Sequence, residues 1–334
     1  MKVLVTGGAG YIGSATCLAL SEAGHTPVIL DSLVNGRIEY TRKYTFYQGD
    51  IADRALLERI FQEQPDIGCC IHFAARIIVP ESVADPFLYY TENVAKSLRF
   101  FKDLEELGCH RVVFSSSASI YGYVPGFIVD ENAPKNPSSP YARTKYMMEM
   151  ILEDLSNATQ LRGIALRYFN PIGAEPGMRV GPYDKHPTHV VANMVKVVTG
   201  EAPVFTITGV DWPTRDGSGI RDYIHIWDLA LAHVAAVEKF DSALEKMNAR
   251  YLPINLGTGD GVTVKELVAA FEEVYGKQLN KAEAGPRPGD VAGCYADPTR
   301  AKELLGWQTH LTIADAIRDV LRWTNEERVK VLGY

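Results

Sequence analysis

Two side chains four residues apart, Tyr141 and Lys145, have the types and spacing that suit acid–base chemistry. On a helix, residues with this spacing lie on the same face, one above the other. A free tyrosine has a pKa of about 10 and is a poor base at neutral pH. A neighbouring ammonium favours the phenolate and lowers that pKa, so the pair is expected to exchange a proton with a substrate near pH 7.

A serine cluster precedes this pair in the chain. Residues 115–122 read Ser-Ser-Ser-Ala-Ser-Ile-Tyr-Gly and follow a predicted strand, Arg111 to Phe114. Serine-rich stretches are typical of turns, but ligands of parallel sheets bind at the carboxyl ends of the strands. A hydroxyl group of this cluster is therefore expected to share a cleft with Tyr141.

A glycine-rich loop near the start of the sequence predicts a nucleotide site. Residues 7–13 read Gly-Gly-Ala-Gly-Tyr-Ile-Gly, between a predicted strand, Lys2 to Thr6, and a helical pattern that runs to Ala23. Three of the glycines fit the dinucleotide fingerprint G-x-G-x-x-G in its required strand–loop–helix context. They let the backbone approach a pyrophosphate, which then rests on the helix N-terminus.

An aspartate indicates which dinucleotide this loop accepts. Asp31 ends a second predicted strand, Thr26 to Leu30, and follows Gly13 by eighteen residues. A carboxylate at this point accepts hydrogen bonds from the ribose hydroxyls of adenosine and repels a 2′-phosphate. The sequence therefore favours NAD over NADP.

Strand and helix patterns alternate along the first half of the chain. Further strands are predicted at Tyr44 to Gln48, Ile67 to Phe73, Gly163 to Tyr168, Leu252 to Asn255 and, outside this alternation, at Val204 to Thr208. Helices are predicted from Asp53 to about Gln64, from Asp85-Pro86 to Leu107, around Tyr141, and at Val190 to Thr199, Trp227 to Phe240, Val264 to Tyr275 and Thr312 to Trp323. Alternation of this kind predicts an α/β fold, a Rossmann-type doubly wound parallel sheet.

The alternation weakens after the sixth strand, which predicts a smaller C-terminal lobe that binds the substrate. We expect an NAD-binding domain at residues 1–170, with a return of about 222–257, and a substrate-binding lobe at 171–334.

Composition excludes several classes of partner. The chain has 334 residues, of which 46% are hydrophobic and 22% charged, and a net charge of −7 without a long basic run. Nucleic acid and membrane surfaces are therefore not expected partners. No leader or membrane-spanning segment is predicted, and the scattered cysteines suggest reduced, mostly buried thiols and a cytoplasmic location. They are Cys17, Cys69, Cys70, Cys109 and Cys294.

Taken together, these motifs resemble the extended short-chain dehydrogenase/reductase superfamily, and within it the UDP-glucose/UDP-galactose 4-epimerases. The resemblance runs nearly end to end. Its most specific parts are Val5 to Gly13, Ser115 to Gly122, Tyr141 with Lys145, Arg167 to Ala174, and Arg221 to His225.

The resemblance implies two sets of binding residues. The residues expected to contact NAD are Gly7, Gly10, Tyr11, Ile12, Gly13, Asp31, Asp50, Ile51, Phe73, Ala74, Ala75, Asn93, Tyr141, Lys145 and Phe169. The residues expected to contact the nucleotide sugar are Ser117, Tyr141, Asn170, His189, Arg221, Arg287, Asp290 and Cys294. His186 and His189 have a metal-like spacing but lack a third ligand.

The same resemblance implies the catalytic roles of Ser117, Tyr141 and Lys145. Tyr141 removes the proton of the sugar 4-hydroxyl while NAD⁺ takes a hydride from C4, and Ser117 relays the proton. Lys145 holds the cofactor ribose. The 4-keto sugar then turns over and is reduced on its other face, which inverts C4.

Several positions depart from the family pattern. Ile77 stands where a lysine near the cofactor phosphates often occurs, and Thr208 where an aromatic residue often packs beside the uracil. Dehydratases carry Asp-Glu directly after the hydroxyl residue, and decarboxylating relatives carry a glutamate at the second of these positions. Here those positions are Ala118 and Ser119, which disfavours both. Epimerases of UDP-glucuronate or UDP-xylose, a dehydratase or reductase, and a non-catalytic NAD-binding protein remain the alternatives.

Two further expectations concern assembly and substrate breadth. The helices at about 86–107 and 141–157 carry apolar residues on more than one face, and in the family these helices form a homodimer interface. Cys294 stands where some epimerases carry a tyrosine beside the 2-substituent of the sugar. A cysteine leaves room there for an acetamido group, which predicts that the N-acetylhexosamine pair is accepted too.

Overall fold

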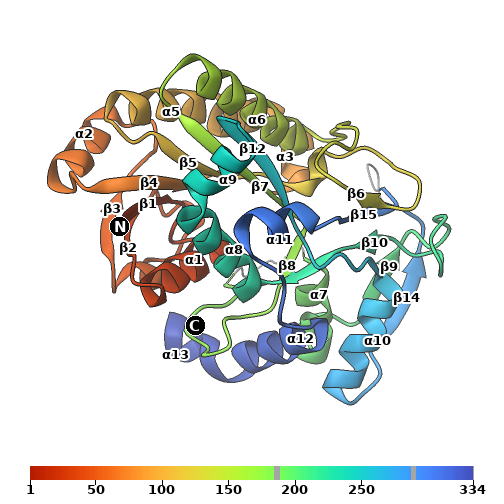
Figure 1. Cartoon of the computed structure of the whole chain (residues 1–334). Coiled ribbons are helices and arrows are strands. Elements are labelled where there is room, and N and C mark those ends of the chain that lie inside the picture. Colours follow the sequence, from red (N-terminus) through yellow and green to blue (C-terminus); the bar gives the residue numbers. More distant parts are fainter. Residues whose placement is uncertain (184–188, 287–290, 334) are drawn as a thin grey trace.

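The computed structural model describes residues 1–183, 189–286 and 291–333, and a seven-stranded parallel sheet is its largest element (Figure 1). The strand order is β12-β7-β5-β4-β1-β2-β3. In chain order these strands are β1 (Lys2–Thr6), β2 (Thr26–Asp31), β3 (Thr45–Gln48), β4 (Ile67–His72), β5 (Arg111–Ser115), β7 (Arg162–Tyr168) and β12 (Tyr251–Leu256). The predicted α/β class and all seven strands are confirmed, with bounds that differ by no more than one residue.

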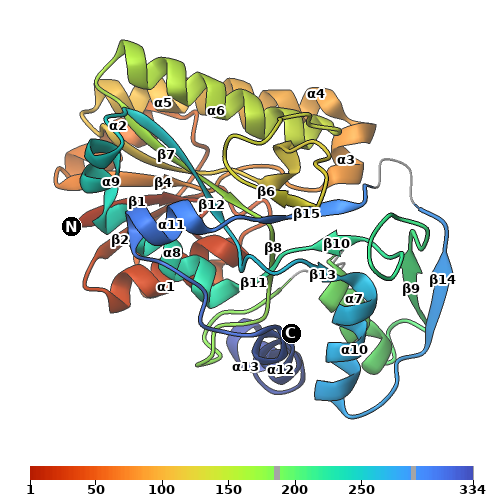
Figure 2. The same ribbon diagram turned by 45° about the vertical axis from the view of Figure 1, so that its right-hand side comes forward.

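Helices cover both faces of this sheet (Figure 2). One face packs against α1 (Tyr11–Glu22) and α8 (Ile226–Glu238), and the other against α2 (Arg54–Glu63), α5 (Lys96–Glu106) and α6 (Pro140–Ala158). The strands are apolar on both sides because both sides are covered.

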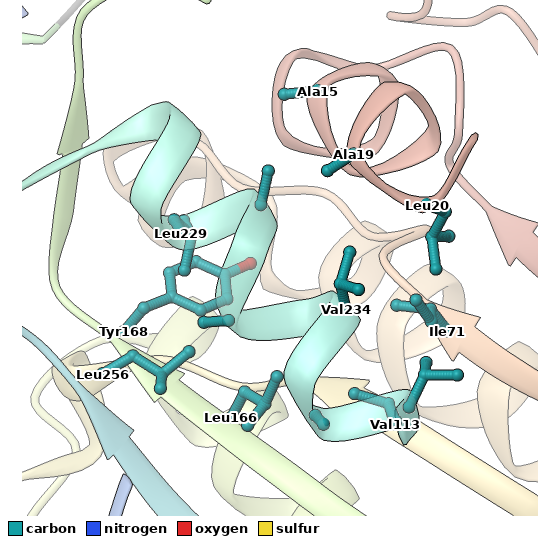
Figure 3. Packing of buried hydrophobic residues seen from close by; sticks show 14 of the residues in the cluster. Ala15, Ala19, Leu20, Ile71, Val113, Leu166, Tyr168, Leu229, Val234 and Leu256 are labelled. Atoms are coloured by element: carbon teal, nitrogen blue, oxygen red, sulfur yellow. The ribbon is translucent and has the colours of Figure 1, made fainter. Parts of the chain in front are cut away.

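Alternation along each strand divides the core into two layers. Val5 and Ile71 belong to the cluster under α1 and α8, where Ala15, Ala19 and Leu229 also pack (Figure 3). Their neighbours in sequence point the other way: Leu4 and Cys70 join Phe100, Phe101 and Met148 under α5 and α6. The sheet is thus held between two buried layers, and its strand order reverses between β1 and β4, where such sheets bind ligands.

The long helix predicted from Asp85-Pro86 to Leu107 is continuous but not uniform. It consists of α4 (Pro86–Tyr89), a π-helical segment η2 (Tyr90–Ala95) and α5. Asp85 begins it by accepting a hydrogen bond from the Leu88 amide, at 3.0 Å. A π-helical turn inside an α-helix often marks a functional site.

The remaining described strands form three small sheets, β13-β10-β15-β6, β11-β8 and β14-β9. They are β6 (Ile128–Val129), β8 (Asn170–Ile172), β9 (Phe205–Thr208), β10 (Ile220–Arg221), β11 (Tyr223–His225), β13 (Val262–Thr263), β14 (Lys281–Ala284) and β15 (Gly293–Ala296). Only β9 is predicted from the sequence, because two to four residues are too few to reveal a strand period. The pairing of β6 with β15 joins segments more than 160 residues apart.

Several more helices lie in the described part of the chain, and Figure 2 shows α7 and α10 beside the small sheets. They are α3 (Val79–Ala84), α7 (Val190–Val198), α9 (Phe240–Lys246), α10 (Val264–Tyr275), α11 (Thr299–Leu305), α12 (Ile313–Arg322) and α13 (Arg328–Leu332), with short helical turns η1 (Ile38–Thr41), η3 (Ala118–Ile120) and η4 (Trp323–Glu327). The helices α7, α10 and α12 pack around a core of their own.

The cysteines are free thiols, and four of the five are buried, as the sequence suggests. Within the described ranges, no helix combines the length and apolar character that crossing a bilayer requires.

Candidate active site

The predicted cofactor residues gather where the central strands end. The glycine loop follows β1, Asp31 ends β2, Asp50 follows β3 and Phe73 follows β4. Because parallel strands share their carboxyl edge, these side chains lie along one line of the sheet.

The glycine loop has no room for side chains. Gly7 has a φ of +73°, and a Cβ there would lie 2.9 Å from the Ala74 amide nitrogen. A Cβ on Gly13 would lie 2.2 Å from the carbonyl oxygen of Gly7. The N-cap of α1 is Gly10, so backbone amides rather than a side chain mark the start of this helix. This geometry fits a pyrophosphate on the helix N-terminus.

Asp31 is held in place by the same loop. One carboxylate oxygen accepts a hydrogen bond from the Ala9 amide at 3.0 Å, and the other from the Leu33 amide at 2.8 Å. The side chain is buried, which raises its pKa, while the two backbone hydrogen bonds lower it. Each carboxylate oxygen can accept a second hydrogen bond, as binding of a ribose diol requires. The residues present therefore fit NAD.

Asp50 has a partner that the sequence does not reveal. Its carboxylate forms an ion pair with Lys96 of α5 at 2.6 Å, and its other oxygen accepts from the Ala52 amide at 2.9 Å. Ile51 beside it is buried.

Asn93 is buried in the π-helical segment η2, and its amide joins two parts of the site. Its oxygen accepts from the Arg76 amide at 2.7 Å, and its nitrogen donates to the Arg76 carbonyl at 2.9 Å and to the Thr144 hydroxyl at 3.1 Å. It thereby joins the segment after β4, with Ala74 and Ala75, to the helix that carries Tyr141.

Ser117, Tyr141 and Lys145 are brought together between β5 and α6. The Tyr141 phenol interacts with the Ser117 side chain, and Lys145 donates to the Ser115 carbonyl at 2.7 Å. The predicted helix is correct, with Ser139 accepting a hydrogen bond from the Ala142 amide at its start.

The electrostatics of this group differ from the expectation. Burial raises the pKa of Tyr141, and the hydrogen bond with Ser117 only partly offsets this rise. Burial also lowers the pKa of Lys145 to about 7, while the carboxylate of Glu149 raises it. The pKa of Tyr141 in the protein alone is therefore raised and not lowered as predicted, because desolvation dominates both groups.

Two phenylalanines follow strands on either side of this group. Phe73 follows β4, and its ring lies 4.7 Å from the imidazole of His233. Phe169 follows β7 and packs against a cluster that contains Ala118 and Tyr121. Tyr11 donates to the Gly173 carbonyl at 2.5 Å, which joins α1 to the segment after β8.

Three of the predicted substrate residues line a cavity of about 220 Å³. Asn170, His189 and Arg221 contribute to its walls, together with Thr208. Arg221 donates to the carbonyls of Ile220 and Ala292, at 2.7 and 2.8 Å, so its guanidinium has a fixed orientation.

Cys294 lies opposite Arg221 in the pairing of β15 with β10. Its thiol is half-buried, and burial raises its pKa to about 11. It packs against the same cluster as Phe169. The other two predicted substrate residues, Arg287 and Asp290, and the histidine His186 lie outside the described residues.

The sequence does not single out Asn193, Thr206 or Trp212, which also line this cavity. Asn193 follows His189 by four residues on α7, a spacing that puts it on the same helix face. Trp212 and Thr206 lie in segments without a recognisable spacing. No group of three or more His, Cys, Asp or Glu side chains that could hold a metal occurs in the part of the chain that the structure describes.

Comparisons with known proteins identify the family of the chain. A family model described as the NAD dependent epimerase/dehydratase family matches residues 3–250. The UDP-glucose 4-epimerase of Bacillus subtilis is 41% identical over 100% of this chain and 99% of its own length. That of Neisseria meningitidis serogroup C is 40% identical over 97% of each chain.

Solved structures give the same result. A UDP-glucose-4-epimerase from Stenotrophomonas maltophila, with bound NAD and formylated UDP-arabinopyranose, has a TM-score of 0.92 and 37% identity, with full coverage of both chains. The enzyme from Bifidobacterium longum, in complex with NAD⁺ and UDP, has a TM-score of 0.91 and 36% identity over 98% of this chain and 99% of its own. The chain belongs to the NAD-dependent epimerase/dehydratase family.

Proposed function

We propose that the protein is an NAD-dependent 4-epimerase of UDP-sugars that works through a transient 4-keto intermediate. The observation that carries the proposal is the meeting of Ser117, Tyr141 and Lys145 at the carboxyl end of β5, on the same edge of the sheet as the glycine loop. Relatives named UDP-glucose 4-epimerase match the chain along its whole length, which supports UDP-glucose and UDP-galactose as substrates.

Each residue of this group has a separate task in the reaction. NAD, when bound, would supply the hydride chemistry at the sugar carbon. Tyr141 and Ser117 hold the oxygen at position 4 and carry its proton. Lys145 binds the cofactor ribose and supplies positive charge beside the phenol.

Tyr141 has a raised pKa in the protein alone, so its deprotonation requires that charge. The positive charges of Lys145 and of the bound cofactor both favour the phenolate in the complex.

The residues of the substrate cavity suit the binding of a nucleotide diphosphate. Arg221 has a fixed guanidinium, which suits a diphosphate, and the hydroxyl of Thr208 and the amide of Asn193 suit polar groups of a nucleoside. Firm binding of the diphosphate lets the hexose turn over between the two hydride transfers.

We assign the NAD site to residues 1–170 with the return of about 222–257, and the nucleotide-sugar site to 171–334.

The dehydratase alternative is weaker because Ala118 is a buried alanine and the acid pair of the dehydratases is missing after Ser117. UDP-glucuronate and UDP-xylose remain alternative substrates. The N-acetylhexosamine pair is proposed as an additional one, because Cys294 is small and lies opposite Arg221.

A panel of UDP-sugars tests this function. The purified protein is incubated with UDP-glucose, UDP-N-acetylglucosamine, UDP-glucuronate and UDP-xylose, and the C4 epimers are resolved by chromatography. We expect interconversion of UDP-glucose and UDP-galactose, and release of NAD or NADH in near-stoichiometric amount on denaturation. Recovery of NADP would contradict the role of Asp31, and absence of any epimer would contradict the function.

A second copy of the chain is the proposed partner, in a two-fold dimer through α5 and α6. An apolar groove of about 400 Å³ runs between these helices and is lined by Leu98, Leu155 and Leu161, among others. Leu98 is 44% exposed and Met150 41% exposed, whereas Phe100, Phe101 and Met148 face the sheet. A clean monomer mass in light scattering at micromolar concentration would contradict the dimer.

Reduced thiols suit the proposed cytoplasmic location.

A further inference from the structure

Three consecutive serines at the end of β5 bind three different parts of the site. The Ser115 carbonyl accepts the hydrogen bond of Lys145 at 2.7 Å. The Ser116 hydroxyl donates to the carboxylate of Glu149. The Ser117 side chain interacts with the Tyr141 phenol and accepts from the Ser119 amide at 3.2 Å. The middle serine is therefore fixed between the two residues that contact the acid–base pair.

Glu149 is a buried carboxylate on the same helix face as Lys145, four residues further along α6. It is 2% exposed, and it accepts hydrogen bonds from three side chains, each in a different part of the fold. Ser116, directly after β5, donates to one oxygen, and Tyr251 of β12 donates to the other at 3.0 Å. Arg167 of β7 donates at 2.6 Å from Nη2. A charge this deeply buried would destabilise the fold without such partners.

Arg167 in turn is fixed to the rest of the site. It is 3% exposed, and its Nη1 donates to the Tyr121 hydroxyl and to the Glu131 carbonyl, both at 2.9 Å. Tyr121 belongs to the segment that follows the serines, and its hydroxyl donates to Asn255 at 2.7 Å. The Glu149 carboxylate therefore lies at the junction of α6, which carries Tyr141 and Lys145, and of β5, which leads to Ser117.

We propose that Glu149 is a positioning residue for the epimerisation: its carboxylate holds Ser116, and so the Ser115–Ser117 segment, against α6, and places a negative charge behind the ammonium of Lys145. This inference rests on the proposed function for its kinetic consequences, but the geometry that it describes does not. The carboxylate does not touch substrate or cofactor and acts through Ser116 and Lys145.

The negative charge of Glu149 raises the pKa of Lys145. Burial lowers the pKa of the Lys145 ammonium to about 7, and Glu149 raises it. The other groups around Lys145 are Tyr141 on α6, the Phe114 ring at 5.1 Å, and His72 on β4, whose pKa is lowered to about 3 so that it stays neutral. The other cation held by Glu149 is the guanidinium of Arg167 on β7. Removal of the Glu149 charge therefore makes Lys145 lose its proton at lower pH.

The test compares Glu149→Gln with the wild-type holoenzyme by two measurements. The first is an NMR titration of protein labelled at lysine Cε, in which the Lys145 signal is assigned by its loss in Lys145→Met. We expect the titration midpoint of Lys145 to fall by about one pH unit. The second is the pH profile of kcat, whose alkaline limb is expected to move in the same direction, while KM for UDP-glucose changes little.

Companion variants separate position from charge and guard against misfolding. Ser116→Ala keeps the Glu149–Arg167 ion pair and is expected to lower kcat without moving the alkaline limb. Tyr251→Phe removes a different hydrogen bond to the same carboxylate and is the matched control, with kcat near the wild-type value. If Glu149→Gln does not fold because Arg167 is left without a counter-charge, the double variant Glu149→Gln/Arg167→Gln is compared with Arg167→Gln, so that the two proteins differ only in the Glu149 charge.

The outcomes are distinguishable. An unchanged titration midpoint of Lys145 in the folded Glu149→Gln variant would overturn the claim that the Glu149 charge acts on Lys145. An unchanged kcat in Ser116→Ala would overturn the claim that Glu149 positions the Ser115–Ser117 segment. A wild-type protein that epimerises no UDP-sugar overturns the proposed function instead, and the NMR titration still tests Glu149.

Discussion

The two sides of the proposed active site are built in different ways. On the side of the large sheet, the reacting groups sit on strands of four to seven residues and on the 19-residue helix α6, and buried hydrogen bonds fix them. On the nucleotide-sugar side, strands of two to four residues carry Arg221 and Cys294 around a cavity of about 220 Å³.

This difference matches what each side has to do. Proton and hydride transfer need atoms held to within fractions of an ångström, which a sheet between two helical layers provides. A sugar that must turn over needs room beside it and a firm hold elsewhere. The comparison predicts that substitutions on the sheet side affect the rate, and that those on the other side affect binding and selectivity.

The largest expected effect is that of Tyr141→Phe. Loss of the phenolic hydroxyl removes the group that takes the sugar proton, and general acid–base catalysis typically contributes two to four orders of magnitude. We expect kcat to fall by about a thousandfold, with NAD content and circular dichroism unchanged. Tyr146→Phe on the same helix is the control. Near-normal turnover of Tyr141→Phe would overturn the acid–base assignment and with it the sheet side of the comparison.

Next in size is Arg221→Met. A hydrogen bond to a charged group contributes about 2 kcal/mol, so KM for UDP-galactose should rise by roughly thirtyfold while kcat stays close to wild type. Arg215→Met is the matched control, because Arg215 pairs with Glu266 at the surface. A fall in kcat with unchanged KM would mean that Arg221 acts on the chemical step rather than on substrate binding.

The third prediction concerns the pH dependence of the free energy of unfolding. It involves His72, a buried residue at the carboxyl end of β4. Its ring interacts with the hydroxyls of Thr6 at 2.7 Å and Ser97 at 3.0 Å, and burial lowers its pKa to about 3. The unfolded chain binds a proton there below about pH 6.5, whereas the folded protein does not. The stability that His72 contributes is present above pH 6.5 and is lost as pH falls toward 3.

At pH 5 this loss is about 2 kcal/mol relative to neutral pH. Urea unfolding at pH 7 and pH 5 measures it. His72→Gln should be less stable at pH 7 but should lose less stability on acidification. His233, whose pKa is lowered to about 4, remains in both proteins and cancels from the difference. An equal acid sensitivity in both proteins would show that His72 is not the buried group responsible.

The smallest expected effect is the one on selectivity. Cys294→Tyr introduces a ring beside Arg221, and steric exclusion in a pocket typically changes selectivity by about tenfold or more. Turnover of UDP-N-acetylgalactosamine should be lost while that of UDP-galactose is largely kept, as measured by competition between the two sugars. If the wild-type protein epimerises UDP-galactose but not UDP-N-acetylgalactosamine, the small size of Cys294 does not determine whether N-acetylated sugars are accepted.

Much of the sheet side can be predicted from the sequence because its signals are local. Strand periodicity, the glycine loop and the Tyr141–Lys145 spacing are each contained within a few residues. They give the α/β class, the seven strands of the sheet and the edge where the cofactor residues meet. The extent of each strand follows from its apolar run, because both faces of the sheet are buried.

Tertiary structure alone determines the contacts that join distant segments. The ion pair of Asp50 with Lys96 and the contact of Ser116 with Glu149 span tens of residues, and the pairing of β6 with β15 spans far more. No local pattern encodes such partners, since any carboxylate can pair with any amine that the fold brings near. The same holds for the raised pKa of Tyr141, which depends on how deeply the fold buries it.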